Sequence, residues 1–113
     1  MHILKLMPIY FEKIRLGEKI YELRLNDEKR QAMKIGDKIE FRKEPDHTEI
    51  CYATIEDLIY FESFHDMLDR LSLDEIGFKG QSKQEAFNLY RKIYSKEKEE
   101  KYKVVAIKVK VIN

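Results

Sequence analysis

Alternation of hydrophobic and polar residues predicts β-strands in several parts of the chain. Residues that favour strands gather at 3–6, 20–25, 38–43, 50–61 and 104–112. Within 38–43, Ile39 and Phe41 alternate with charged residues, a pattern typical of a strand with one buried face. The stretch 50–61 carries hydrophobic residues on both faces, which indicates a curved strand in a barrel or in a covered sheet.

Hydrophobic residues at helical spacing predict helices between these strands. Pro8 suits the first turn of a helix that runs to about residue 16 and ends at Gly17. Hydrophobic residues at 64, 67, 68 and 71 form the clearest amphipathic stripe, after an N-cap at Ser63. A further helix begins at Ser82, where Glu85 completes a capping box.

The order of these elements, β-α-β-β-β-α-α-β, predicts an α+β fold. We expect a small, curled, mainly antiparallel β-barrel with helices packed outside it, in one domain over residues 1–113. Residues 77–80 are predicted to be a flexible connection, and residues 95–103 a solvated loop or a frayed helix end. The predicted core residues are Phe41, Ile55, Leu68, Phe87, Ile107 and Val109.

The charged residues nearly cancel, which limits the kinds of partner that the whole molecule would attract. Lysine and arginine together number 22, aspartate and glutamate 21, and the formal net charge is +1. This balance argues against a dedicated polyanion binder, which usually has a basic domain. A local rim that follows phosphates is a candidate, although a solvated surface is the favoured interpretation. Its residues would be Arg15, Lys34, Lys38, Arg42 and Lys43.

Cysteine and histidine usage indicates neither disulfide nor metal chemistry. The single cysteine, Cys51, cannot form an internal disulfide, which suits a reducing compartment. His2, His47 and His65 lie in different elements, so no metal site and no cofactor is expected. No signal-peptide pattern is seen, and no hydrophobic run approaches the roughly 18 residues that span a membrane. We therefore expect a cytoplasmic protein without a membrane partner.

The motif Gly17-x-Lys19-x-x-Glu22-x-Arg24 places charges in a segment that otherwise looks buried. Successive side chains of a strand point to opposite faces, so Glu22 and Arg24 share one face. One interpretation is a structural ion-pair cluster, because buried charges are tolerated only when they are paired. The other is a ligand cleft, in which Arg24 binds a phosphate or a base edge and Lys19 supplies a second cation.

This motif, followed by Ile35-Gly36-Asp37-Lys38-Ile39-Glu40-Phe41, resembles the signature of the ASCH domain, a family of the PUA-like superfamily. Phe61-Glu62-Ser63-Phe64 at a helix start resembles a second family pattern, and the closing strand 102–107 a third. Lys103 in that strand stands where many relatives have glycine. The resemblance spans nearly the whole chain, and it implies a PUA-like barrel that binds RNA or a modified nucleoside.

The resemblance also implies a set of ligand-binding residues. Lys19, Glu22 and Arg24 would line the cleft, and Arg42, Ser63 and Tyr94 are further candidates. Among the aromatic residues, Phe64 and Tyr90 are expected in the core, and Tyr60 is a weaker candidate for stacking on a base than Tyr94 at its helix end.

Some members of the ASCH family are small amidohydrolases that act on acetylated cytidine, and the resemblance therefore implies this activity as the alternative function. Their proposed set is a lysine, a threonine and a glutamate. The lysine corresponds to Lys19, but Glu22 stands at the threonine position. No acid matches the glutamate near Lys79 and Gly80, and Glu75 is the nearest upstream. Lys19 and Glu22 remain candidates for an acid–base pair, although the partial match favours a protein that binds without catalysis.

Overall fold

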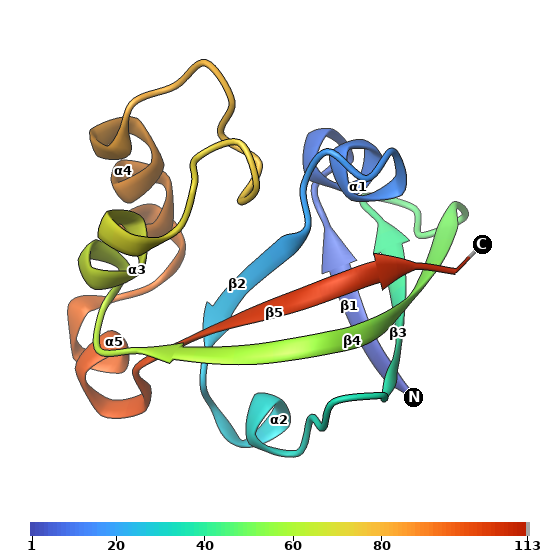
Figure 1. The fold of residues 1–113 in the computed structure, drawn as a ribbon, viewed down its shortest axis with the longest axis horizontal. Coiled ribbons are helices and arrows are strands. Elements are labelled where there is room, and N and C mark those ends of the chain that lie inside the picture. The colour runs from blue at the N-terminus through green and yellow to red at the C-terminus, as the bar shows by residue number, and fades with distance from the viewer. Residues whose placement is uncertain (113) are drawn as a thin grey trace.

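The computed structural model describes residues 1–112 and shows one curled sheet with helices packed around it (Figure 1). Its elements in chain order are β1 (His2–Leu6), α1 (Pro8–Arg15), β2 (Tyr21–Leu25), α2 (Glu28–Gln31), β3 (Lys38–Lys43), β4 (Ile50–Phe61), α3 (Phe64–Arg70), α4 (Lys83–Ile93), α5 (Lys96–Tyr102) and β5 (Val104–Val111).

The sheet has the order β1-β3-β4-β5-β2, which leaves β1 and β2 as its two edges. β1 pairs with β3 in parallel, and the three other pairings are antiparallel. The strand β4 is long and has an irregularity between Ile55 and Asp57, and the sheet curls into a half-barrel that stays open between its two edges. The predicted α+β class with a curled, mainly antiparallel sheet is confirmed.

Two hydrophobic clusters lie on opposite faces of this sheet. The first fills the inside of the curl beneath α1 and includes Phe11, Phe41 and Ile55. The second lies between the outer face and the helices α3 and α4, and includes Phe64 and Leu68. The strand β5 contributes to both, since its alternate side chains enter one cluster or the other. Its N-terminal half is therefore buried on both faces.

Two predicted segments are more ordered than their composition suggested. The glycine-rich stretch 77–80 was predicted to be a flexible connection, but Phe78 within it is 2% exposed. Residues 96–102 form the helix α5, with an N-cap at Ser95. Glu99 of this helix is buried. Its carboxylate accepts hydrogen bonds from the backbone nitrogen of Phe64 and from Arg91, and these contacts make the burial tolerable. Lys103 then ends α5 with φ of 64°, a conformation that glycine adopts more readily.

One predicted core residue, Phe87, is less deeply buried than expected. Phe87 is only half-buried, at the border of the outer cluster, where its ring stacks on that of His65 at 3.8 Å between centroids. Ala86 and Tyr90 are the buried residues of this helix instead. Among residues 1–112 no helix has both the length and the hydrophobicity to cross a membrane.

Candidate functional site

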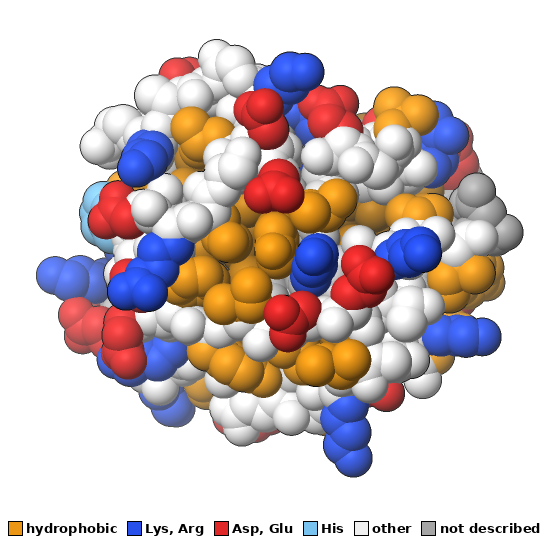
Figure 2. All heavy atoms as spheres, viewed as in Figure 1, with side chains coloured by type: hydrophobic (Ala, Val, Ile, Leu, Met, Phe, Trp, Pro, Cys, Tyr) orange, Lys and Arg blue, Asp and Glu red, His pale blue; other side chains and the backbone are white. Residues whose placement is uncertain are grey.

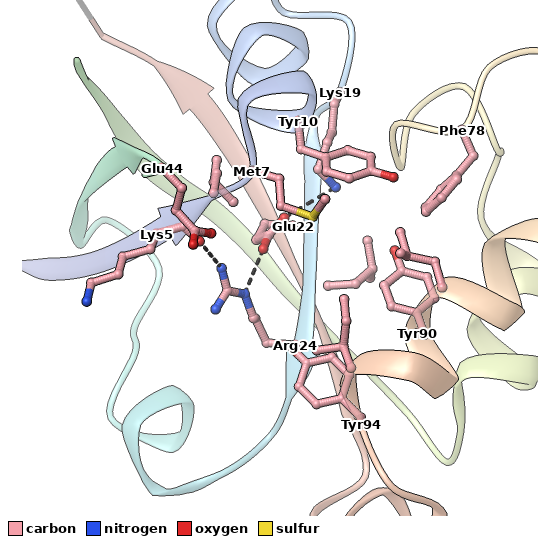
Figure 3. Close-up of a pocket in the computed structure, with 14 residues that line it drawn as sticks. Lys5, Met7, Tyr10, Lys19, Glu22, Arg24, Glu44, Phe78, Tyr90 and Tyr94 are labelled. Atoms are coloured by element: carbon pink, nitrogen blue, oxygen red, sulfur yellow. Dashed lines mark hydrogen bonds and ion pairs between the residues drawn. The ribbon is translucent and has the colours of Figure 1, made fainter. Parts of the chain in front are cut away.

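A pocket of about 290 Å³ opens between the two edge strands, where the half-barrel is incomplete. Figure 2 shows hydrophobic side chains gathered around a hollow on this face, with charges of both signs beside it. Residues from β1, α1, β2, the α3–α4 loop and α4 line the pocket (Figure 3): Lys5, Leu6, Met7, Tyr10, Lys19, Glu22, Leu23, Arg24, Glu44, Phe78, Leu89, Tyr90, Ile93 and Tyr94.

The three charged residues of the motif meet at one wall of this pocket, as predicted. The Oε2 atom of Glu22 lies 2.6 Å from Nε of Arg24, and its Oε1 atom lies 3.3 Å from Nζ of Lys19. Lys19 is 3% exposed and Glu22 is 7% exposed. Such burial is tolerated because each charge faces an opposite one. The two cations thus hold the carboxylate in one orientation.

Arg24 also connects the two edges of the sheet. Its Nη2 atom donates a hydrogen bond of 2.9 Å to the backbone oxygen of Lys5 in β1 (Figure 3). Among residues 1–112 no acceptor takes a hydrogen bond from its Nη1 atom. The guanidinium is therefore fixed by two contacts and retains donor capacity at the pocket.

Lys19 is fixed by acceptors on three sides. Its Nζ atom donates to the backbone oxygens of Tyr21 and Ile76, in addition to its contact with Glu22. Neighbouring residues hold the same loop, since Lys13 donates to the backbone oxygen of Gly77 and the backbone nitrogen of Ile20 donates to Glu75. Lys19 therefore anchors the α3–α4 loop, which carries Phe78 into the pocket wall.

Burial and charge shift the pKa values of the cluster in identifiable ways. Burial lowers the pKa of the Lys19 amine, and the adjacent Glu22 carboxylate offsets part of that effect. Burial would raise the pKa of Glu22, but Arg24 and Lys19 together hold it below its ordinary value. Glu22 is thus a carboxylate at neutral pH, an acceptor of hydrogen bonds rather than a donor.

The opposite wall of the pocket is aromatic. Phe78 lies 5.7 Å from Tyr10 and 5.7 Å from Tyr90 between ring centroids. Tyr90 and Tyr94 both stack on Phe64, at 4.6 Å and 5.4 Å. Phe64 and Tyr90 are buried core residues, as predicted. Tyr94 reaches the pocket from the end of α4, with one face of its ring already covered.

Two predicted site residues lie elsewhere. Arg42 pairs with Glu40 on β3 at 2.6 Å and is not among the pocket residues. The side chain of Ser63 accepts a hydrogen bond from the backbone nitrogen of Asp66 and begins α3. Arg15 and Lys43 of the suggested basic rim both pair with Glu12, which supports the solvated-surface interpretation.

Sequence reasoning missed two charged pocket residues, Lys5 and Glu44. Lys5 lies in an exposed edge strand and Glu44 in a loop, and neither belongs to a motif. They reach the pocket because β1 runs parallel to β3, so the residue after β3 lies next to the end of β1: the backbone nitrogen of Glu44 donates to the oxygen of Leu6. That pairing has no local signal in the sequence.

Of the residues suggested for amide hydrolysis, Lys19 and Glu22 lie together in the pocket wall, but Glu75 does not join them. Glu75 is exposed, and its backbone oxygen, not its carboxylate, contacts the motif strand at Ile20 and Tyr21. The amine of Lys19 already donates to three acceptors. Within residues 1–112 no group of three or more histidine, cysteine or acidic residues is arranged to hold a metal ion.

Comparison with known proteins agrees with this architecture. The ASCH domain profile matches residues 4–113. The crystal structure of hypothetical protein PH0355 is 33% identical, with a TM-score of 0.86 over 97% of each chain. The solution structure of protein PF0455 from Pyrococcus furiosus is 30% identical, with a TM-score of 0.78 over 99% of this chain and 97% of that one.

More distant structures share the fold. The crystal structure of ASCH from Zymomonas mobilis is 19% identical, with a TM-score of 0.66 over 98% of this chain and 71% of that one. A search of curated proteins found no match. The profile match over nearly the whole chain, together with the half-barrel and its neighbours, shows that this chain belongs to the ASCH domain family.

Proposed function

We propose that this protein binds a single nucleobase, presented by RNA or by a modified nucleoside, in the pocket between β1 and β2. The observation that carries the proposal is the pairing of a fixed Glu22–Arg24 group with an aromatic wall in one small pocket. Stacking combined with hydrogen bonds to the base edge is how proteins recognise unpaired bases. The PUA-like relationship of the family supports this proposal by analogy of fold.

The size of the pocket favours one ring system over an extended strand. A volume of about 290 Å³ lies at the lower end of the range for small-molecule sites. Its walls are mostly hydrophobic, with Tyr10, Phe78 and Tyr90 on the side facing the charged cluster. A flat heterocycle is the ligand that suits such a space, because one part can contact rings while its edge meets polar groups.

The polar wall offers both kinds of hydrogen-bonding group. Each oxygen of Glu22 has one cation, and a carboxylate oxygen can accept more than one hydrogen bond. Arg24 retains donor capacity at Nη1. Base edges present donors beside acceptors, so they complement such a wall. The near-neutral chain and the single exposed lysine at the pocket, Lys5, suggest that phosphate contacts add little.

The test is a titration with the four ribonucleosides and with short single-stranded RNA, on the native protein and on Arg24→Ala. We expect the variant to bind about tenfold to a hundredfold more weakly, the effect of losing a charge-assisted hydrogen bond. Arg42→Ala is the matched control, because Arg42 pairs with Glu40 at the same 2.6 Å outside the pocket. That control should bind as the native protein does.

Other outcomes would overturn the proposal. Native protein that binds neither nucleosides nor RNA at millimolar concentrations would exclude a base site. Equal loss of binding in the Arg24 and Arg42 variants would mean that the pocket is not responsible. Release of acetate from acetylated cytidine would assign the alternative amidohydrolase activity in place of simple binding. Circular dichroism melts on each variant separate lost binding from lost fold.

A further inference from the structure

The pocket extends around the free edge of β2 and therefore contacts main chain as well as side chains. Glu22 and Arg24 lie on one side of the strand, and Tyr90 and Tyr94 lie on the other (Figure 3). Leu23 points to the opposite face from its two neighbours, yet it also lines the pocket. One pocket can reach both faces only across the strand edge, and β2 is the last strand of the sheet.

The pairing with β5 determines which backbone groups face that edge. The backbone nitrogen of Val109 donates to the oxygen of Ile20, and that of Asn26 donates to the oxygen of Lys103. These residues are in register with the antiparallel pairing in which Glu22 lies opposite Ile107. Hydrogen bonding alternates along such a pair, so even-numbered residues of β2 bond to β5.

The N–H and C=O groups of the odd-numbered residues consequently point to the open side. Tyr21 agrees with this assignment: its nitrogen donates to the oxygen of Glu75 and its oxygen accepts from Lys19. Leu23 is next along the edge, and among residues 1–112 no group outside the sheet bonds to its main chain. Leu23 lines the pocket, so one free N–H and one free C=O lie side by side on the strand edge that borders it.

We infer that the main chain of Leu23 recognises the ligand through a pair of hydrogen bonds. The N–H donates to an acceptor on the ligand, and the C=O accepts from a donor next to it. The ligand class is a flat heterocycle with an N–H beside a carbonyl or ring nitrogen, which is the unsubstituted Watson–Crick edge of a base. This inference rests on the proposed function and specifies which edge of the base enters.

A peptide strand also presents alternating donors and acceptors, but the free edge is too short for one. Tyr21, the preceding edge residue, is already bonded to Glu75 and Lys19. Beyond Leu23, the guanidinium of Arg24 crosses to Lys5 of β1. Strand addition needs a continuous row of free groups, whereas within the pocket this edge offers those of Leu23 alone, and Arg24 separates it from Leu25, the next outward-facing residue.

The test replaces the Leu23 amide by an ester, using the α-hydroxy analogue of leucine, which removes the N–H and keeps the buried side chain. The same replacement at Leu25 is the matched control, because that N–H also points away from β5 but lies outside the pocket. We expect the ester at position 23 to weaken uridine or cytidine binding about threefold to tenfold, the loss of one neutral hydrogen bond. The ester at position 25 should leave binding unchanged.

A second measurement examines the ligand side. In native protein, 3-methyluridine and N4,N4-dimethylcytidine should bind at least tenfold more weakly than uridine and cytidine, because the methyl groups remove the donor that faces the Leu23 oxygen. Native binding of bases that is unaffected by the ester at position 23 would overturn this inference and leave the proposed function standing. Absence of any base binding by the native protein would overturn both. Equal loss with the two esters would show a general weakening of β2 and would also overturn the inference.

Discussion

Glu22 holds the charged wall of the pocket together, because each of its oxygens faces a different cation. Its alternation with Arg24 was visible in the sequence, since residues two apart share a face of a strand. The full burial of Lys19 was not visible, because its acceptors include the backbone oxygen of Ile76, 57 residues away. Local spacing predicts which side chains share a face, and tertiary packing decides which of them lose contact with water.

We predict that Glu22→Gln lowers the free energy of unfolding by about 3–5 kcal/mol at pH 7, because two cations then lose their partner. The variant should also respond less to acid. The pKa of Glu22 is lowered in the folded protein, so its stabilisation is complete above the ordinary carboxyl pKa. It is lost as the pH falls through the lowered value.

Urea denaturation at several pH values below about 5 measures this difference. The native curve of stability against pH should be steeper than that of the variant. Glu40→Gln is the control, since it breaks the comparable pair with Arg42 where no buried lysine is involved. Parallel curves for the native protein and the Glu22 variant would contradict the prediction.

The α3–α4 loop is the element for which sequence and structure differ most. Its glycines at 77 and 80 suggested flexibility, but glycine also serves where another chain segment passes closely. Here a β-carbon at Gly77 would lie 2.8 Å from Cδ of Lys19, and its φ of 97° disfavours other residues. Composition cannot distinguish a glycine that makes a loop flexible from one that is required because another side chain packs against its α-carbon. Here that side chain belongs to Lys19, which is distant in sequence.

We predict that Gly77→Ala destabilises the protein more than Gly36→Ala. Both glycines have positive φ, at 97° and 93°, which costs about 1–3 kcal/mol for an alanine. An added β-carbon at Gly36 has nothing within 4 Å, so the excess at Gly77 reports the contact with Lys19. Thermal melts give the two losses, and nucleoside titration should show weaker binding for Gly77→Ala alone. Equal losses would mean that the loop yields without moving the lysine.

For the whole molecule, the order of the elements and the alternation within strands such as 38–43 were sufficient to predict the class and the curled sheet. In the last strand, however, Val104 and Ala106 are buried as deeply as Val105 and Ile107, although they lie on opposite faces. A second hydrophobic layer beneath α3 and α4 explains that result. Whether the second face of the sheet is buried depends on where α3 and α4 pack in the folded protein. No local sequence pattern gives that position.

We predict that Ile55→Ala, in the inner cluster, and Leu68→Ala, in the outer cluster, each cost about 2–5 kcal/mol. Because β5 belongs to both clusters, each change should shift one common unfolding transition, as expected for a single domain. Denaturation followed by far-ultraviolet circular dichroism and by tyrosine fluorescence tests this expectation. Separate transitions for the two probes would show that the clusters unfold independently. A decrease in the free energy of unfolding below about 1 kcal/mol for either variant would place that residue outside the core.

The position of Leu23 at a free strand edge has a consequence for how such a pocket changes over generations. Every amino acid except proline supplies the same N–H and C=O, so substitutions at this position leave these two main-chain groups unchanged. Aromatic and charged walls, by contrast, change with each replacement of a side chain. If the Leu23 main chain is the recognition group that we propose, new ligand preferences can arise from changes in the side chains of the walls while the main-chain contact stays the same.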